Sequence, residues 1–367
     1  MRLCFIANAN SIHTRRWIEP FLRRGDEVHL LSYMRVKTPW PEVVLVDLTK
    51  LPGPPKGKLY NWVRWVRGYL QRVQPDILHA HQVTIAGWLG ALTGFHPFVI
   101  SAWGSDLLMA PQHSLWQRWK TQFAIRRCDR LITPSSLLKE AALQLGAPAS
   151  RIHVIPWGVE TEIFSPTPTD RDMTRKAFGI RSDAHVILSP RGLRPLYNHD
   201  IVIDAVAQLI PEFPSLHLCF LDFNPDATYK EALQQRILNL NLTDRVTWLP
   251  PQPDRSAMAR LYRMADIVIS IPSSEGYGFS VYEALACATP AIISDLPIFH
   301  QSLTHETHVL KVPKRDVTKT ARALRRLLTD TGLRDRLRQQ GAKLMHELNV
   351  ENRVSAAITL YQHILEA

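Results

Sequence analysis

The chain has 367 residues, of which 46% are hydrophobic and 21% charged, and this length and composition are typical of a two-domain globular protein. No apolar run reaches the ~20 residues that a membrane span needs, and the first run, residues 3–7, is too short for a signal-peptide core. The net charge of +11 predicts an anionic partner, and cytoplasmic localisation is expected.

Short apolar strands alternate with amphipathic helical stretches through the first half. Strands are predicted over residues 3–7, 27–31, 43–46, 76–80, 97–101, 130–133 and 152–155. Helical periodicity lies between them, for example over 59–73 and 137–145. This alternation predicts a parallel sheet covered by helices on both faces.

A turn-rich linker over residues 164–170 interrupts the pattern, which then restarts. Strands are predicted over 185–189, 216–221, 245–249, 267–271, 291–294 and 308–312. Helices are predicted over 202–209, 229–238, 282–287, 318–328, 333–344 and 353–365. We therefore predict an α/β chain with an N-terminal Rossmann-like domain (1–165) and a C-terminal one (166–349). The last helix, 350–367, is expected to pack back on the first domain.

Two doubly wound units in tandem are expected to bind a ligand between them, at the carboxyl ends of their strands. The pattern alone fits a two-domain dehydrogenase or a hinged binding protein equally well.

The segment from Pro272 to Pro290 carries the most specific signal: an apolar strand, a glycine turn and a helix. Gly276 and Gly278 allow the backbone to approach a ligand closely. The first N–H groups of the helix form an anion site suited to a diphosphate. Glu275 and Glu283, eight residues apart, are poor phosphate ligands but good acceptors for sugar and ribose hydroxyls.

This segment resembles the E-x7-E signature of the retaining family 4 glycosyltransferases, which have the GT-B fold. Weaker matches follow the family's order along the whole chain. They are Asp76 to His81, Trp103 to Asp106, Cys128 to Ser135, Ile155 to Phe164 and Ser189 to Leu193.

The resemblance implies two Rossmann-like domains that face each other across a cleft, and it implies roles for residues. Those implied to be catalytic are His81, Glu275 and Arg191. Those implied to bind the donor are Arg191, Gly276, Tyr277, Gly278, Phe279, Ser280 and Glu283, with Glu283 on the ribose and Arg191 on the diphosphate. Those assigned to the acceptor side are Asn10, Ser11, His13, Trp103 and Asp106. We expect His79 to face away from this site, which makes it the weaker candidate.

The sequence departs from the family pattern at three places. A diphosphate-binding Lys usually follows the Arg191 motif, but Asn198 stands near that position. Arg194 either replaces the missing charge at the donor site or is an ordinary exposed residue. The first strand–helix turn, around Asn10, lacks the usual glycine pair, and Ala288 replaces a usual Gly.

No metal or other cofactor is expected, because the D-x-D triplet Asp170–Asp172 lies in the linker rather than at a strand end. Helix N-termini and arginines would neutralise the leaving diphosphate instead. The four cysteines, Cys4, Cys128, Cys219 and Cys287, form no C-x-x-C pair, so neither a zinc site nor a disulfide framework is expected.

The positive charge is uneven. Residues 1–165 hold 20 Lys and Arg against 11 Asp and Glu, or +9, whereas the rest hold 24 against 22, or +2. Residues 48–75 have no acid and mix six cations with Trp62 and Trp65, and a second basic, aromatic cluster spans 116–127. Either these helices dock at an anionic membrane at its inner face, or they are ordinary core-facing helices. No nucleic-acid recognition module is present.

The sequence thus predicts a transferase that moves a hexose from a UDP- or GDP-sugar to a glycan, lipid-linked or small-molecule acceptor, with retention. A GT-B sugar-nucleotide epimerase and a non-catalytic sugar-nucleotide-binding protein remain alternatives.

Overall fold

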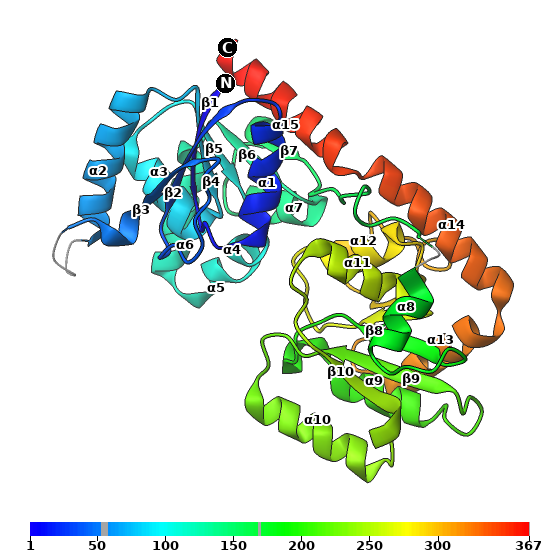
Figure 1. Cartoon of the computed structure of the whole chain (residues 1–367). Coiled ribbons are helices and arrows are strands. Elements are labelled where there is room, and N and C mark those ends of the chain that lie inside the picture. Colours follow the sequence, from blue (N-terminus) through cyan, green and yellow to red (C-terminus); the bar gives the residue numbers. More distant parts are fainter. Residues whose placement is uncertain (53–57, 168–169, 367) are drawn as a thin grey trace. The chain divides into compact units, whose positions relative to one another are not determined.

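Two parallel sheets organise the chain, each in its own unit (Figure 1). The computed structural model describes residues 1–52, 58–167 and 170–366. Lys56 of the basic segment, residues 168–169 of the predicted linker and Ala367 of the predicted last helix lie outside these ranges. The first unit contains Met1–Trp157 and Glu351–Ala367, and the second contains Gly158–Val350.

The first sheet has seven parallel strands in the order β3-β2-β1-β4-β5-β6-β7. Its strands are β1 (Arg2–Ala7), β2 (Glu27–Ser32), β3 (Val44–Asp47), β4 (Ile77–His81), β5 (Phe98–Ser101), β6 (Arg130–Thr133) and β7 (Ile152–Val154). The helices of this unit are α1 (Ile12–Arg23), α2 (Lys58–Val73), α3 (Trp88–Thr93), α4 (Ser105–Leu108), α5 (Ala110–His113), α6 (Leu115–Arg127), α7 (Ser136–Gln144) and α15 (Val350–Leu365), with a π-helical turn over Val83–Gly87.

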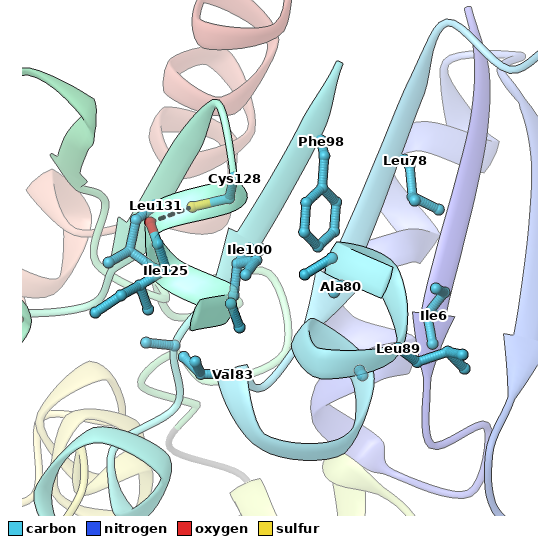
Figure 2. Packing of buried hydrophobic residues seen from close by; sticks show 14 of the residues in the cluster. Ile6, Leu78, Ala80, Val83, Leu89, Phe98, Ile100, Ile125, Cys128 and Leu131 are labelled. Atoms are coloured by element: carbon cyan, nitrogen blue, oxygen red, sulfur yellow. Dashed lines mark hydrogen bonds between the residues drawn. The ribbon is translucent and has the colours of Figure 1, made fainter. Parts of the chain in front are cut away.

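Its core is built from strand residues that point to one face of the sheet. Figure 2 shows Leu78 and Ala80 of β4 beside Phe98 and Ile100 of β5, with Leu89 of α3 packed on them. Strands buried on both faces read as continuous apolar runs, which is why the sequence predicted them well.

The second sheet has six parallel strands in the order β10-β9-β8-β11-β12-β13. Its strands are β8 (His185–Ser189), β9 (Leu216–Leu221), β10 (Val246–Leu249), β11 (Ile267–Ser270), β12 (Ala291–Ser294) and β13 (Leu310–Val312). Its helices are α8 (Asp170–Ala177), α9 (His199–Ala207), α10 (Ala227–Asn239), α11 (Arg255–Met264), α12 (Phe279–Ala286), α13 (Val317–Thr329) and α14 (Thr331–Glu347). The two doubly wound α/β units confirm the predicted fold class.

In both sheets the strand order reverses direction once, between β1 and β4 and between β8 and β11. Doubly wound sheets bind their ligands outside the carboxyl ends of the strands at this switch point. The loops after β1, β4, β8 and β11 are therefore where functional side chains are expected.

The unit boundary lies earlier than the predicted one after residue 165. The N–H of Val159 donates to the carbonyl of Leu348 at 2.9 Å, and that of Val350 donates to Val159 at 3.1 Å. Phe164 is buried, with its ring 6.0 Å from that of Tyr262. Residues 158–165 therefore pack with the second unit, and Asp170–Asp172, expected in the linker, begin α8.

The last helix, α15, packs on the first sheet. The hydroxyl of Tyr361 lies 2.6 Å from Nδ1 of His79, and its ring stacks on Phe21 at 5.7 Å. Within the described ranges, no helix has the length and apolarity that a bilayer span requires.

Candidate active site

The glutamate segment follows β11 at the switch point of the second sheet. The strand ends at Ser270, the turn runs through Glu275, and α12 begins at Phe279 with Gly278 as its N-cap. Gly278 has φ of +89°, and a Cβ there would lie 2.7 Å from the ring of Phe299. Only glycine fits this conformation and this space, and as N-cap it offers the first turn no side-chain acceptor.

Arg191, in the loop after β8, reaches across to this turn. Its guanidinium lies 2.8 Å from Oε2 of Glu275, donates to the hydroxyl of Ser280 at 2.9 Å, and covers the ring of Tyr197 at 4.3 Å. These contacts hold the guanidinium in one place, beside the first turn of α12.

The surroundings of Arg191 also keep its guanidinium protonated. Burial alone would lower the pKa of the guanidinium, but the Glu275 carboxylate and then the Tyr197 hydroxyl outweigh it, so the pKa is raised. The side chains of Arg191 and Glu275 are 14% and 12% exposed, so water screens the pair little.

The two glutamates of the motif lie in different surroundings. Glu275 sits in the turn, where its Oε1 accepts the N–H of Gly276 at 3.0 Å. Glu283 is buried on α12, where its Oε2 accepts the hydroxyl of Tyr262 at 2.9 Å. Burial and the neighbouring Glu283 raise the pKa of Tyr262 well above its ordinary value, so its hydroxyl remains a donor.

The remaining donor candidates divide between the site and the core. Ser280 contacts Arg191, whereas the Tyr277 ring is buried 4.8 Å from the rings of both Phe279 and Tyr282. Tyr277 therefore contributes packing beneath the turn, and the Gly276 N–H, predicted to hold the donor, is already occupied by Glu275.

Asn198, which stands where the family usually has a lysine, holds two loops of the second unit together. Asn198 is fully buried with φ of +53°, and its amide donates to the carbonyl of Ile271 at 2.7 Å and to the hydroxyl of Ser273 at 3.0 Å. It thereby ties the loop after β8 to the loop after β11. Its side-chain oxygen accepts from Arg315 at 2.8 Å.

Arg194 does not join Arg191. It is exposed, and its guanidinium donates to the side-chain oxygen of Asn224 at 3.0 Å and to that residue's carbonyl at 3.3 Å. The interpretation of Arg194 as a surface residue of this loop thus fits the structure better than its role as the replacement cation.

In the first unit, His81 ends β4 at the switch point, beside Phe5, Trp17 and Trp103 at ring distances of 5.4 to 5.8 Å. It is fully buried, and neither ring nitrogen has a hydrogen-bond partner among the described residues. Burial, then the positive charges of Arg353 and His13, lower its pKa to about 3, so the imidazole is neutral at physiological pH.

His13 and Trp103, both predicted, join His81 in this cluster. Their rings are 5.5 Å apart, and each lies within 6 Å of Trp157. Burial, then the charge of Arg16, lowers the pKa of His13 to about 4.

The other acceptor-side candidates serve the local backbone. Asp106 is buried and accepts the N–H groups of Val83, Trp103 and Gly104 at 2.8 to 3.0 Å. Ser11 caps α1 by accepting the N–H of His13 at 3.2 Å, and the exposed Asn10 bonds the backbone of Arg35 and Lys37 at 2.8 Å. Asp106 therefore positions Trp103. Asp106, Ser11 and Asn10 all stabilise the backbone of the surrounding loops.

The expectation for His79 was wrong. Residues two apart on a strand share a face, and the His79 and His81 rings lie 5.0 Å apart. His79 nevertheless differs from His81, because both its nitrogens are engaged, with Tyr361 at 2.6 Å and Ser101 at 2.8 Å. It is a satisfied core histidine, whereas His81 is not.

Sequence reasoning missed Tyr197, which lies against the Arg191 guanidinium, and Tyr262, which donates to Glu283. It also missed Arg315, which donates to Asn198, and Arg353, whose charge lowers the pKa of His81. No spacing signal pointed to them, because each contact forms only in the folded chain. Among the described residues, no cluster of three or more His, Cys, Asp or Glu side chains could hold a metal ion.

Comparison with known proteins identifies the family. A model of glycosyl transferases group 1 matches residues 170–344, and a model of glycosyl transferase 4-like proteins matches residues 2–135. The chain belongs to the group 1 glycosyltransferases. The predicted family is thereby confirmed.

Relatives with assigned names include two D-inositol 3-phosphate glycosyltransferases. That of Mycobacteroides abscessus is 32% identical over 218 residues, covering 58% of this chain and 47% of the relative. That of Acidothermus cellulolyticus is 30% identical over 249 residues, covering 66% and 54%. The matched region spans about half the length of these relatives.

Solved structures of glycosyltransferases share the fold over nearly the whole chain. HepE of Anabaena, in complex with UDP and glucose, has a TM-score of 0.82 at 18% identity, covering 98% of this chain and 99% of HepE. Sucrose-phosphate synthase of Thermosynechococcus elongatus has a TM-score of 0.81 at 19% identity, covering all of both chains. This group 1 glycosyltransferase thus has the GT-B fold.

Proposed function

We propose that the protein transfers a hexose from a UDP- or GDP-sugar to an acceptor hydroxyl with retention, without a metal ion. The observation that carries this proposal is the position of Arg191, which is fixed by Glu275, Ser280 and Tyr197 beside the N-terminus of α12. A diphosphate placed there would meet a permanent positive charge and the first N–H groups of a helix.

Departure of the nucleoside diphosphate is the step that needs most stabilisation. Negative charge accumulates on the leaving phosphate oxygen, and preorganised cations and dipoles aimed at it lower the barrier. In this proposal Arg191 and the α12 N-terminus supply that stabilisation in place of a metal.

The two glutamates would orient the donor. Glu275 would accept hydroxyls of the sugar, and Glu283, held by Tyr262, would accept the ribose hydroxyls. UDP is the first nucleotide to test, because the similar HepE structure contains UDP and glucose.

For His81 we propose a role at the reacting sugar. A neutral imidazole without a hydrogen-bond partner among the described residues can accept or donate one bond to a ligand hydroxyl without first breaking another.

A thermal-shift screen of the purified chain against UDP, GDP, ADP and their hexose conjugates tests donor binding. Release of nucleotide from the best donor is then followed with acceptors that include D-inositol 3-phosphate, the substrate in the names of the relatives. Transfer of the sugar with retained anomeric configuration supports the proposal. Conversion of the donor to an epimer without acceptor, or binding without nucleotide release for any acceptor, would instead support the epimerase or the binding protein.

A further inference from the structure

An exposed group of apolar side chains lies on α6 of the first unit and at Met109, the residue before the short helix α5. Leu115 is 86% exposed, Trp116 59%, Met109 54% and Trp119 47%. We call these four residues the α6 patch. Tryptophans are rarely so exposed without a binding role, because each ring removes much apolar area from water when covered.

The patch is rigidly built. The rings of Trp116 and Trp119 stack at 5.0 Å with an angle of 14°. Beneath them lies the buried Trp88 of α3, 6.2 and 5.4 Å from the two rings. Since α6 packs on α3 and on the π-helical turn Val83–Gly87, the outer tryptophans are held in place before any partner arrives.

The charge around the patch has one sign. Residues 107–128 contain no Asp or Glu but include Arg118, Lys120, Arg126 and Arg127. The Lys120 ammonium lies 5.8 Å from the ring centre of Trp116, so aromatic and basic groups share one surface. A partner that fits must be both apolar and negatively charged.

The other basic helix of this unit differs. In α2, Trp62 and Trp65 are half-buried and pack against the core of the first unit, so the core-facing interpretation fits these tryptophans. From the sequence, the tryptophans of residues 48–75 were expected to take part in membrane docking. In the structure, the exposed tryptophans are those of α6 instead.

We propose that the α6 patch docks the protein on an anionic lipid bilayer, with Trp116 and Trp119 at the headgroup level. Exposed tryptophans and cations on one helix are the combination that interfacial binding uses. A second copy of this chain is a poorer partner, because it would bring the same positive charge to the contact. The proposal is independent of the catalytic one, since the patch contains none of the donor-site residues.

The test uses the full chain in co-sedimentation with vesicles of phosphatidylcholine alone or with 30% phosphatidylglycerol. We expect binding to the anionic vesicles at low salt, and weaker but measurable binding at high salt, because the apolar part is not screened. Arg118→Glu should lower the partition coefficient roughly fivefold or more at low salt. Leu115→Ser/Trp116→Ser should lower it at least tenfold at both salt concentrations.

Matched controls come from the second unit. Leu238→Ser, on the exposed face of α10 (59% exposed), and the exposed Lys319→Glu on α13 should leave binding unchanged. Each variant's unfolding midpoint is measured first, and Leu115→Ser alone serves if the double variant does not fold.

Three results would overturn the proposal. One is no binding of the wild type to anionic vesicles at low salt, and another is wild-type binding by the patch variants. The third is a dimer in light scattering that the patch variants dissociate, because the patch would then join two copies of the chain.

Discussion

Replacing Glu275 by Gln should lower turnover, whereas the affinity for UDP should stay the same or increase. The substitution keeps the size of the side chain, but one amide oxygen replaces two carboxylate oxygens, of which Oε1 accepts the Gly276 N–H and Oε2 pairs with Arg191. The amide oxygen can keep the bond from Gly276, and the NH2 group then faces the guanidinium. It removes the negative charge and the acceptor for Arg191 but keeps the bond from Gly276, so the turn and α12 should stay folded.

The effect on UDP follows from charge. In the free protein Glu275 pairs with Arg191 at 2.8 Å, and a diphosphate must compete with this carboxylate for the guanidinium. Removing one nearby negative charge in a partly buried site is worth about 1 kcal/mol, or roughly fivefold in Kd. UDP should therefore bind Glu275→Gln as tightly as, or several-fold more tightly than, the wild type.

The effect on turnover has the other sign. The proposed bonds from sugar hydroxyls to the carboxylate would become neutral hydrogen bonds, which are weaker by ~1 kcal/mol or more each. The positive charge that develops on the sugar would also lose a nearby anion, so kcat should fall at least tenfold.

Titration calorimetry with UDP and a coupled assay of UDP release measure the two effects, and Glu212→Gln, an exposed ion-paired glutamate on the surface, is the control. A tenfold loss of UDP affinity with unchanged kcat would show that Glu275 binds the nucleotide rather than the sugar.

Three further predictions concern the ribose, metal ions and pH. Glu283→Gln should weaken UDP binding by ~1.5–3 kcal/mol, which calorimetry would record as a roughly tenfold to 150-fold higher Kd. Tyr262→Phe should weaken it less, because the Glu283 carboxylate remains. An unchanged affinity of the Glu283→Gln variant would exclude the ribose contact. Transfer should survive excess EDTA in the assay, and loss of activity that Mg²⁺ or Mn²⁺ restores would refute metal independence. His13, His81 and His199 have pKa values lowered by burial to about 4, 3 and 4, so the unfolded chain binds more protons below pH ~6.5 and the free energy of unfolding should fall as pH falls from 7 to 4. Calorimetric midpoints measure this loss, and a His81→Gln variant whose midpoint falls as steeply as that of the wild type would show that His81 does not contribute.

The fold could be predicted because parallel strands buried on both faces produce runs of apolar residues that local patterns reveal. Ile267–Ser270 and Leu216–Leu221 are such runs, and the structure has strands at both. The unit boundary was harder to predict from the sequence, since residues 158–165 belong to the second unit through contacts with the distant residues Leu348 and Tyr262.

In the candidate site, too, local features could be predicted from the sequence, whereas contacts between distant residues could not. The turn from Glu275 to Ser280 is local, so sequence spacing alone predicted a carboxylate beside a glycine turn and a helix N-terminus. The approach of Arg191, which is 89 residues from Ser280, was known only through the family resemblance. The direction of Arg194 could not be read from the sequence either, because it depends on Asn224 in the loop after β9.

The pairing of Arg191 with Glu275 offers a reason why this site tolerates the loss of the family's lysine. A largely buried guanidinium without a partner would be costly to maintain in the empty protein, and the Glu275 carboxylate balances it there. At the position of the lysine, Asn198 is neutral and ties the two loops by hydrogen bonds, and the cation that contacts it, Arg315, is balanced by Asp200 at 3.0 Å. When a diphosphate binds, it would take over the neutralisation of Arg191 and free Glu275 to accept sugar hydroxyls. We therefore infer that binding of the donor and orientation of the sugar are coupled through this one ion pair.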